Sequence, residues 1–194
     1  MNGIIIIDKP QEWTSNDVVS RLRRVFNTRR IGHGGTLDPM ATGVLPVFVG
    51  RATRGVEFFE HAEKVYEATL RFGLTTDTED ITGKTITECE VHLTEEDLLA
   101  VLPKFRGDIL QVPPMYSAIK VNGQKLYDLA RKGREVERQA RPITIHELEL
   151  LEFTGIEARL RVRCSKGTYI RTLCKDIGEA LGCGGCEAFN SRGG

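Results

Sequence analysis

The 194-residue sequence predicts a single α+β domain. Segments with strand periodicity and segments with helix periodicity follow one another without a regular βαβ rhythm, which favours α+β over a doubly wound parallel sheet. A chain of this length with 40% hydrophobic residues can bury one substantial core, and it is short for two. No internal repeat or low-complexity linker divides the sequence, so we expect one folding unit.

The elements expected in the N-terminal half follow from the spacing of apolar residues. Four consecutive isoleucines at 4–7 are typical of a buried strand. Apolar residues at helical spacing from Val18 to Phe26 predict a helix that Thr14 or Ser15 can cap. Alternation of apolar and polar residues at 66–72 predicts a half-buried strand. The other elements expected here are a buried strand at 44–49, a short helix at 52–59 and a polar loop at 75–82.

The C-terminal half continues the mixture of strands and helices. Thr94 and Asp97 resemble a capping pair for a helix through Leu102, and Pro113 and Pro114 exclude regular structure around them. The other elements expected here are a strand at 117–121, a short helix ending near 133, strands at 143–151 and 157–164, and a last helix at 168–181. Three arginines share one face of the strand at 157–164. They could track phosphates or form a solvated outer face, and the sequence leaves both readings open.

The formal net charge is zero, but this value averages unlike segments. Residues 1–54 carry 8 Lys and Arg against 4 Asp and Glu, residues 55–110 carry 5 against 13, and residues 111–194 carry 14 against 10. Basic ends around an acidic middle allow an electropositive surface for an anionic polymer. Charge patterning alone does not exclude a solvated distribution without a partner.

The number of cysteines and the length of the apolar runs indicate the cellular compartment. Five cysteines, an odd number without the spacing of a small secreted domain, predict reduced thiols. Cys183 and Cys186 form a lone C-x-x-C without a second pair, so we expect no zinc and no other metal. No apolar run approaches the roughly 20 residues of a membrane span. The sequence therefore predicts a cytoplasmic protein with no membrane contact.

The segment 30–45 surrounds one carboxylate, Asp38, with a backbone suited to the close approach of a ligand. Its four glycines can take positive φ, and Pro39 biases Asp38 toward an extended conformation. His33 adds a flat ring, and Thr36 and Thr42 add two hydroxyls. Arg29 and Arg30 bring positive charge immediately upstream. The same composition also fits an ordinary turn that contains an aspartate and several glycines. Local composition therefore leaves open whether Asp38 is a turn residue or a functional carboxylate.

Five segments resemble one known family in its own order. The run GHGGTLDPMATGVLPV at 32–47 is similar to the catalytic motif of the bacterial tRNA pseudouridine-55 synthases, the TruB family, in which the aspartate of GTLDP is the nucleophile. Asp38 stands at that position. The runs that also match are IDKP at 7–10, KVY at 64–66, QVPPMYSA at 111–118 and KGTYIRTL at 166–173. The resemblance extends to about Gly182 and implies a mixed, mostly antiparallel sheet with flanking helices and an RNA-binding cleft.

The resemblance also implies the catalytic residues. Conversion of uridine to pseudouridine breaks the bond from N1 to C1′, turns the uracil and joins C5 to C1′, which needs a carboxylate, a cation, an aromatic surface and a base for the C5 proton. By resemblance, Asp38 is the nucleophile or sugar-deprotonating base, and Arg171 is its ion-pair partner. Tyr66 is the stacking platform and Tyr169 a second aromatic. Arg171 lies near the start of a predicted helix, where the macrodipole disfavours a cation, so it needs an anionic partner.

The implied substrate-binding residues are His33, Lys9, Thr36 and Gly35. The imidazole of His33 suits the space that an extruded nucleotide leaves in its stack. Plainer interpretations stay open for three residues. Tyr66 lies on the apolar side of its strand and could be a core residue, Lys9 could be a surface lysine after a strand, and His33 could make a local hydrogen bond in its loop.

The implied activity is isomerisation of uridine 55 in the T-loop of tRNA by base flipping, without a cofactor. Gly83-Lys84-Thr85 imitates the end of a phosphate-binding loop, but Thr78 stands where the earlier glycine is required. The expected partner is the T-arm of tRNA, and the expected state is a monomer. The competing class is a non-catalytic RNA-binding protein or tRNA-folding chaperone. Asp38 discriminates between the classes, because a carboxylate near phosphates weakens attraction and serves only an enzyme.

The last residues depart from the family. We expect a catalytic domain at 1–182 and a divergent or truncated tail at 183–194. Relatives usually continue through an apolar segment, a Leu and an Arg-Thr pair to a small RNA-binding PUA domain, and none of these is in the sequence. A frameshifted terminus, a truncated one and a naturally short variant are the hypotheses. Each predicts an incomplete cleft wall and an impaired enzyme.

Overall fold

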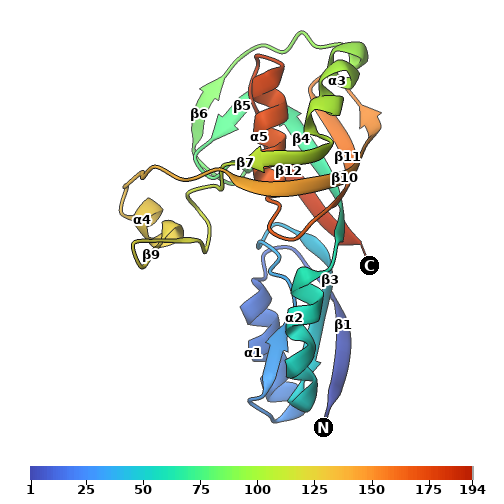
Figure 1. Cartoon of the computed structure of the whole chain (residues 1–194), viewed down its shortest axis with the longest axis vertical. Helices are drawn as coiled ribbons and strands as arrows, with labels where there is room; N and C mark the ends of the chain where they lie inside the picture. The colour runs from blue at the N-terminus through green and yellow to red at the C-terminus, as the bar shows by residue number, and fades with distance from the viewer. Residues whose placement is uncertain (194) are drawn as a thin grey trace.

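The computed structural model describes residues 1–193 and has an elongated shape with two lobes (Figure 1). The N-terminus lies in the smaller lobe, and the C-terminus lies near the junction of the two lobes. The smaller lobe contains β1 (Gly3–Lys9), α1 (Ser15–Phe26), β2 (Ile31–His33), β3 (Thr42–Val49), a 3-10 turn (Gly50–Gly55) and α2 (Val56–His61). In the part of the chain that the structure describes, no helix is long and apolar enough to cross a membrane.

One mixed sheet runs through both lobes. Its strands in the larger lobe are β4 (Lys64–Phe72), β7 (Gly107–Gln111), β10 (Arg141–Phe153), β11 (Glu157–Cys164) and β12 (Gly185–Gly193). The strand order is β1-β3-β12-β4-β11-β10-β7, and β2 pairs with β3. Each neighbouring pair is antiparallel except β12 with β3, which is parallel. The predicted α+β class with a mostly antiparallel sheet is confirmed.

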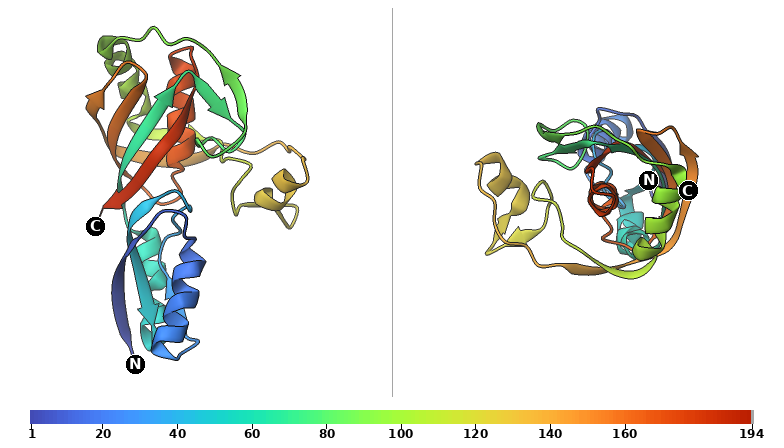
Figure 2. Two further views of the ribbon diagram at one scale, coloured as in Figure 1. Left: turned by 180° about the vertical axis from the view of Figure 1, so that it is seen from behind. Right: turned by 90° about the horizontal axis from the view of Figure 1, so that it is seen from above.

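Helices and short hairpins complete the larger lobe. Its helices are α3 (Glu95–Val101), a 3-10 turn (Leu102–Phe105), α4 (Leu126–Arg131) and α5 (Ile170–Ala180). The hairpins pair β5 (Leu74–Thr76) with β6 (Thr85–Glu88) and β8 (Lys120–Val121) with β9 (Gln124–Lys125). The segment 112–140, which we call the arm, carries α4 and the β8–β9 hairpin and projects from the lobe (Figure 2). Helix α5 packs against β12 and β4.

Both predicted helix caps are present. The Asp17 N–H donates to Thr14 Oγ1 at 2.9 Å, and the Thr14 N–H donates to Asp17 Oδ2 at 2.8 Å. Thr94 and Asp97 make the same reciprocal pair at the start of α3. Aspartate thus fills the role that Glu or Gln usually fills in a capping box, because its shorter side chain still reaches the first backbone N–H.

Two hydrophobic clusters occupy the two lobes. The cluster in the larger lobe surrounds Leu70, Leu160 and Ile177, and the cluster in the smaller lobe surrounds Val18 and Leu45. The ring of Tyr66 packs against both clusters. The junction between the lobes therefore lies at β4 and its neighbours in the sheet.

Several predicted boundaries differ from the structure for local reasons. The last helix begins at Ile170 rather than at 168, because Gly167 takes φ +80° and Thr168 Oγ1 closes a turn on the Ser165 carbonyl. The strand expected at 117–121 contracts to β8, because the Ser117 N–H donates to the Met115 carbonyl and makes a turn. The helix expected at 52–59 is a 3-10 turn followed by α2, and the loop expected at 75–82 contributes β5.

The three arginines of β11 form an exposed ladder of ion pairs with glutamates. Their shortest N–O distances are 3.7 Å for Arg159 to Glu152, 3.2 Å for Arg161 to Glu67 and 2.8 Å for Arg163 to Glu63. Each guanidinium therefore has a protein carboxylate as partner. The structure favours the solvated outer face over a phosphate track.

The terminal segment 183–194, set apart as a tail by sequence, contributes a central strand. Residues 185–193 form β12, which lies between β3 and β4 and joins the sheet of the two lobes. Its contact with β3 needs Gly43, whose φ is +108° and whose Cα lies so close to the Arg192 backbone that a Cβ atom would overlap the Arg192 carbonyl. Three residues of this strand, Glu187, Asn190 and Arg192, line the cavity where the lobes meet.

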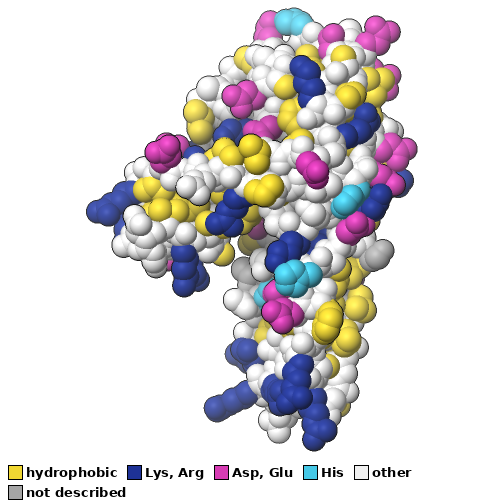
Figure 3. Space-filling model, viewed as in Figure 1, with side chains coloured by type: hydrophobic (Ala, Val, Ile, Leu, Met, Phe, Trp, Pro, Cys, Tyr) yellow, Lys and Arg dark blue, Asp and Glu magenta, His cyan; other side chains and the backbone are white. Residues whose placement is uncertain are grey.

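Charge is unevenly distributed over the surface. Lys and Arg side chains gather at the tip of the smaller lobe and on the arm, whereas acidic side chains are frequent at the far end of the larger lobe (Figure 3). Most of the smaller lobe and the arm come from the two basic segments of the sequence, whereas α2 and α3 come from the acidic one. The charge segmentation of the sequence is therefore also a spatial one on this face.

Candidate active site

A cavity of about 510 Å³ opens where the lobes meet. Its walls come from the Asp38 loop, β4, the arm, the segment 165–171 and β12. Cationic side chains on these walls are Lys64, Lys125, Lys166, Arg171 and Arg192, and the carboxyl groups are Asp38, Glu60 and Glu187. The cavity thus combines the Asp38 carboxylate, which stands on a loop, with a lining in which cations outnumber carboxyl groups.

The backbone around Asp38 is fixed by neighbouring segments. The Leu37 N–H donates to Ser15 Oγ at 3.0 Å, and the Glu12 N–H donates to the Pro39 carbonyl at 2.7 Å. Leu37 is buried in the core of the smaller lobe. The Asp38 side chain is 41% exposed and lines the cavity. The loop therefore anchors its apolar residue inward and presents its carboxylate to the cavity.

Arg171 reaches Asp38 from the first turn of α5. Its Nε lies 3.1 Å from Asp38 Oδ2, and its side chain is only 8% exposed. The two Nη atoms donate to the carbonyls of Thr78 at 3.2 Å and Tyr116 at 3.0 Å. The expected pairing of Arg171 with Asp38 is present, and the backbone acceptors hold the guanidinium in one orientation.

Two tyrosines flank the ion pair. Burial raises the pKa of both the Tyr66 and the Tyr169 hydroxyl groups, so both are neutral. Tyr169 is positioned by Gln111, which accepts from the Tyr169 N–H at 2.9 Å and donates to the Tyr169 carbonyl at 3.0 Å. The sequence allowed Tyr66 to be either a core residue or a residue of the site. Its ring packs on both hydrophobic clusters and also lines the cavity.

The predicted substrate-binding residues separate into two groups. Gly35 and Thr36 line the cavity with Asp38, whereas Lys9 and His33 lie outside its lining. The buried ammonium of Lys9 donates to the carbonyls of Pro10, Trp13 and Pro39. Lys9 thus supports the backbone next to Asp38, and it is not the surface lysine that the sequence allowed. Burial lowers its pKa despite the nearby Asp38 carboxylate.

His33 occupies β2 behind the Asp38 loop. Its Nδ1 is buried without a hydrogen-bond partner among residues 1–193, so the local hydrogen bond that the sequence allowed is not seen at this atom. Burial lowers the pKa of the imidazole, and the Arg192 cation lowers it further. A direct contact of His33 with an extruded nucleotide stays a prediction.

Arg192 is a site residue that the sequence did not reveal. Its guanidinium donates to the Val44 carbonyl at 2.8 Å and to the Gly35 carbonyl at 2.9 Å, and it lies 5.4 Å from the centre of the Phe59 ring. It is 3% exposed. Its place in the segment expected to be a tail hid it, and the residues around it show no strand periodicity that could have found it.

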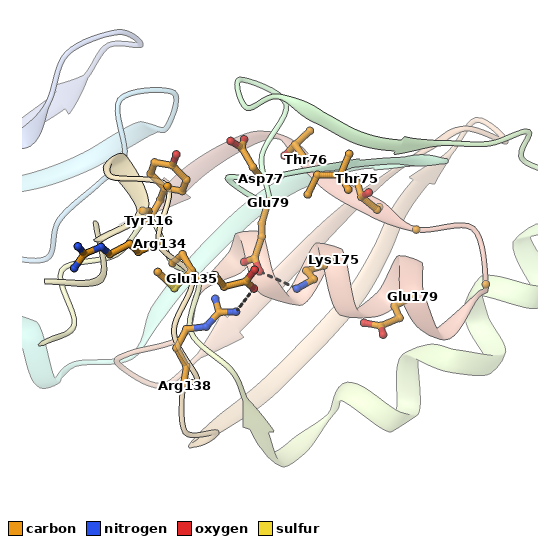
Figure 4. Close-up of a pocket in the computed structure, with 17 residues that line it drawn as sticks. Thr75, Thr76, Asp77, Glu79, Tyr116, Arg134, Glu135, Arg138, Lys175 and Glu179 are labelled. Carbon is orange, nitrogen blue, oxygen red and sulfur yellow. Dashed lines mark hydrogen bonds and ion pairs between the residues drawn. The ribbon is translucent and has the colours of Figure 1, made fainter. Parts of the chain in front are cut away.

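A second cavity of about 550 Å³ lies between α5 and the arm (Figure 4). Within it Lys175 pairs with Glu79 at 3.1 Å, and Arg138 pairs with Glu135 at 3.4 Å. Tyr116 lines both cavities. Over residues 1–193 no group of three or more His, Cys, Asp or Glu side chains is placed to hold a metal ion.

Comparison with known proteins gives a family match. Residues 23–170 match the model described as TruB family pseudouridylate synthase (N terminal domain). The chain is 52% identical over 187 residues to tRNA pseudouridine synthase B of Francisella tularensis subsp. tularensis, covering 95% of this chain and 62% of the relative. It is 51% identical over 184 residues to the protein of the same name from Tolumonas auensis, covering 95% and 57%. The chain thus spans about three fifths of the length of these relatives.

Solved structures agree with this match. A crystal structure of a Cbf5-Nop10-Gar1 complex is similar with a TM-score of 0.77 and 33% identity, covering 98% of this chain and 47% of that chain. A structure of an H/ACA RNP bound to a substrate RNA containing 2′-deoxyuridine is similar with a TM-score of 0.73 and 30% identity, covering 98% and 46%.

Proposed function

The chain belongs to the TruB family of pseudouridylate synthases, and from this premise we propose that it isomerises uridine to pseudouridine in tRNA. The observation that carries the proposal is the Asp38 carboxylate, held 3.1 Å from Arg171 at the wall of a cavity lined with cations. The names of the curated relatives support tRNA as the substrate class.

We assign the covalent or proton-transfer step at the sugar to Asp38. Its carboxylate is the anionic group on the loop wall of the cavity, and part of it is open to solvent for contact with a nucleotide. Arg171 fixes the orientation of this carboxylate, because its remaining N–H groups are held by backbone carbonyls. The reaction replaces the N1–C1′ bond of one nucleotide by a C5–C1′ bond, so it is redox-neutral and needs no cofactor.

The tyrosines are assigned to the detached base. A neutral Tyr66 ring at the cavity wall offers an apolar face for the uracil while the base turns, and Tyr169 lies beside Arg171. Gly35 and Thr36 stand on the loop side of the same cavity. We therefore propose that these residues contact the extruded nucleotide, and that Lys9 acts only by supporting Pro39.

We propose the T-loop of tRNA, at position 55, as the target. The support for this position is the motif around Asp38 and its match to the family, together with the cations of the cavity that suit a phosphate backbone. We further propose that the protein acts as a monomer in the cytoplasm. A binding-only role is disfavoured, because Asp38 weakens attraction to phosphates and, among residues 1–193, its side chain pairs only with Arg171.

The experiment is to incubate the protein, after exhaustive chelation and dialysis, with an unmodified tRNA transcript and to map pseudouridine. We expect modification at position 55 and none in a transcript with cytidine there. Binding without modification would favour the RNA-binding or chaperone alternative. Activity that returned only with an added metal ion would contradict the proposed chemistry.

A further inference from the structure

β12 places a buried carboxyl group without a partner in the wall of the Asp38 cavity. Glu187 is 1% exposed, and neither of its carboxyl oxygens has a hydrogen-bond partner within residues 1–193. Asn190 is 7% exposed, and its Oδ1 is likewise unpaired in that range. Both side chains line the cavity. Buried polar groups without partners are rare in folded proteins, so this pair needs an explanation.

A β-bulge puts the two side chains on one face. Residues three apart in a regular strand point to opposite faces of the sheet. The pairing of β12 with β4 shifts register between Glu187 and Phe189, and the extra residue returns Asn190 to the side of Glu187. The Glu187 N–H donates to the Glu79 carbonyl at 3.0 Å, and the Ile81 N–H donates to the Glu187 carbonyl at 2.8 Å. The position of this carboxyl group is therefore built into the backbone.

The surroundings of Glu187 disfavour an anion there. The ionisable groups that face it are Asp38 on its loop, Asp80 on the loop after β5, Arg171 and Cys174 on α5, and Cys186 on β12. Burial raises the pKa of the Glu187 carboxyl well above its usual range, the Asp38 charge raises it further, and Arg171 opposes both. Burial also raises the pKa of Cys174 and Cys186, so both thiols are neutral.

Arg171 is the one cation in this set, and it is already engaged. Its guanidinium serves Asp38 and the carbonyls of Thr78 and Tyr116. A second carboxylate at this depth would compete with Asp38 for the same guanidinium, because two anions near one cation cannot both be fully compensated.

We propose that Glu187 is a positioning residue for the proposed isomerase: it stands in the cavity wall as a neutral carboxylic acid, donates its O–H to Asn190, and leaves the Arg171 guanidinium to Asp38. Burial and the Asp38 charge are the largest influences on the Glu187 pKa. Asn190 lies next to the carboxyl group, and its amide opposes the rise in that pKa less than Arg171 does. A proton on Glu187 supplies a donor among the three oxygens of the two side chains that have no hydrogen-bond partner within residues 1–193. The inference rests on the proposed function, because positioning is measured through turnover.

The first test compares pH profiles of single-turnover isomerisation. Glu187→Gln keeps the size, the neutrality and an N–H donor, whereas Glu149→Gln removes an exposed carboxylate from β10 and serves as the control. We expect Glu187→Gln to lie within about twofold of the wild type at neutral pH. As pH rises into the alkaline range, wild-type turnover should fall as Glu187 ionises, the control should follow it, and Glu187→Gln should not fall. The same alkaline decline in all three proteins would overturn the inference.

The second test reads the proton directly and needs no turnover. Infrared spectra of wild-type protein labelled with ¹³C-glutamate should contain a carboxylic acid carbonyl band at pH 7, and Glu187→Gln should lack it. The label excludes Asp176, whose pKa burial raises to about 6. An absent band in the folded wild-type protein overturns the inference, even if the variant does not fold. If the wild-type protein forms no pseudouridine, the proposed function fails, and the band still decides whether Glu187 is neutral.

Discussion

Arginine and carboxylate side chains meet in two regions of this molecule with different consequences. On the outer face of β11, Arg161 shares Glu67 at 3.2 Å and Glu149 at 3.6 Å, and its side chain is 45% exposed. In the cavity, Arg171 meets Asp38 at 3.1 Å and is 8% exposed. The two regions have similar partners and similar distances, so the ion pair itself does not distinguish the site.

The difference lies in what else each guanidinium contacts. The ladder arginines exchange among exposed glutamates in water, where such pairs contribute about 0.2–1 kcal/mol. The Arg171 guanidinium also donates to two backbone carbonyls, which leaves it one orientation. Position rather than charge therefore makes the cavity pair suited to chemistry, and each prediction below tests one side of this contrast.

Apart from loss of the Asp38 carboxylate itself, the largest effect is expected from Arg171→Lys. Lysine keeps the charge but cannot hold Asp38 and the carbonyls of Thr78 and Tyr116 at once, so turnover should fall by about 100-fold or more while tRNA affinity changes little. Single-turnover rates and equilibrium binding check this, with Arg161→Lys as the matched exposed control. Equal loss of rate and affinity would instead identify Arg171 as a phosphate contact.

Gly43→Ala should destabilise the protein at the contact of β3 with β12. The added carbon meets the Arg192 backbone, and φ +108° is unfavourable for alanine, so we expect a loss of about 2–4 kcal/mol in the free energy of unfolding. Denaturant titration measures this loss. Gly155→Ala, which also has positive φ but meets nothing within 4 Å, separates the strain from the clash. Equal losses in both variants would rule out the clash.

The buried His33 should make the molecule sensitive to acid. Burial and Arg192 lower its pKa in the folded protein, so its contribution to stability is present above the unfolded pKa of about 6.5 and is lost as pH falls through the lower folded pKa. His33→Gln should therefore reduce the loss of stability on acidification below pH 6.5. Exposed His92→Gln is the control, and matching pH dependence in the two variants would contradict the assignment.

The smallest effect is expected on the ladder. Arg161→Ala should lower the free energy of unfolding by less than about 1 kcal/mol, and the loss should shrink as salt rises. Turnover should stay unchanged. A large salt-independent loss would show that the outer face is not the weakly coupled region described above.

The elements with strong local signals were predictable from sequence. The isoleucine run, the two capped helices and the alternating segments gave β1, α1, α3, β4, β10 and β11 with small boundary errors. The short strands β2, β5, β6, β7 and β9 were missed, because two to five residues carry too little periodicity to be recognised. Strand β12 was missed because its hydrogen bonds go to β3 and β4, which are distant in the sequence. No periodicity in residues 183–194 indicates a strand.

The residues of the candidate site were also predictable only in part. The resemblance brought forward Asp38, Arg171, Tyr66 and Tyr169, and the structure gathers them around one cavity. Sequence could not show that Lys9 is fully buried under backbone carbonyls, since a lysine after a strand is usually exposed. It also could not show Glu187, whose burial depends on a bulge in β12.

The most direct measurement is the single-turnover rate of pseudouridine formation, with tRNA affinity, for Asp38→Asn beside Glu67→Gln. Both changes replace the carboxylate partner of an arginine by an amide of similar shape. We expect no detectable pseudouridine from Asp38→Asn with tRNA affinity within about threefold of the wild type, and unchanged rate and affinity for Glu67→Gln. Turnover by Asp38→Asn at a rate near that of the wild type would contradict the role of the cavity pair.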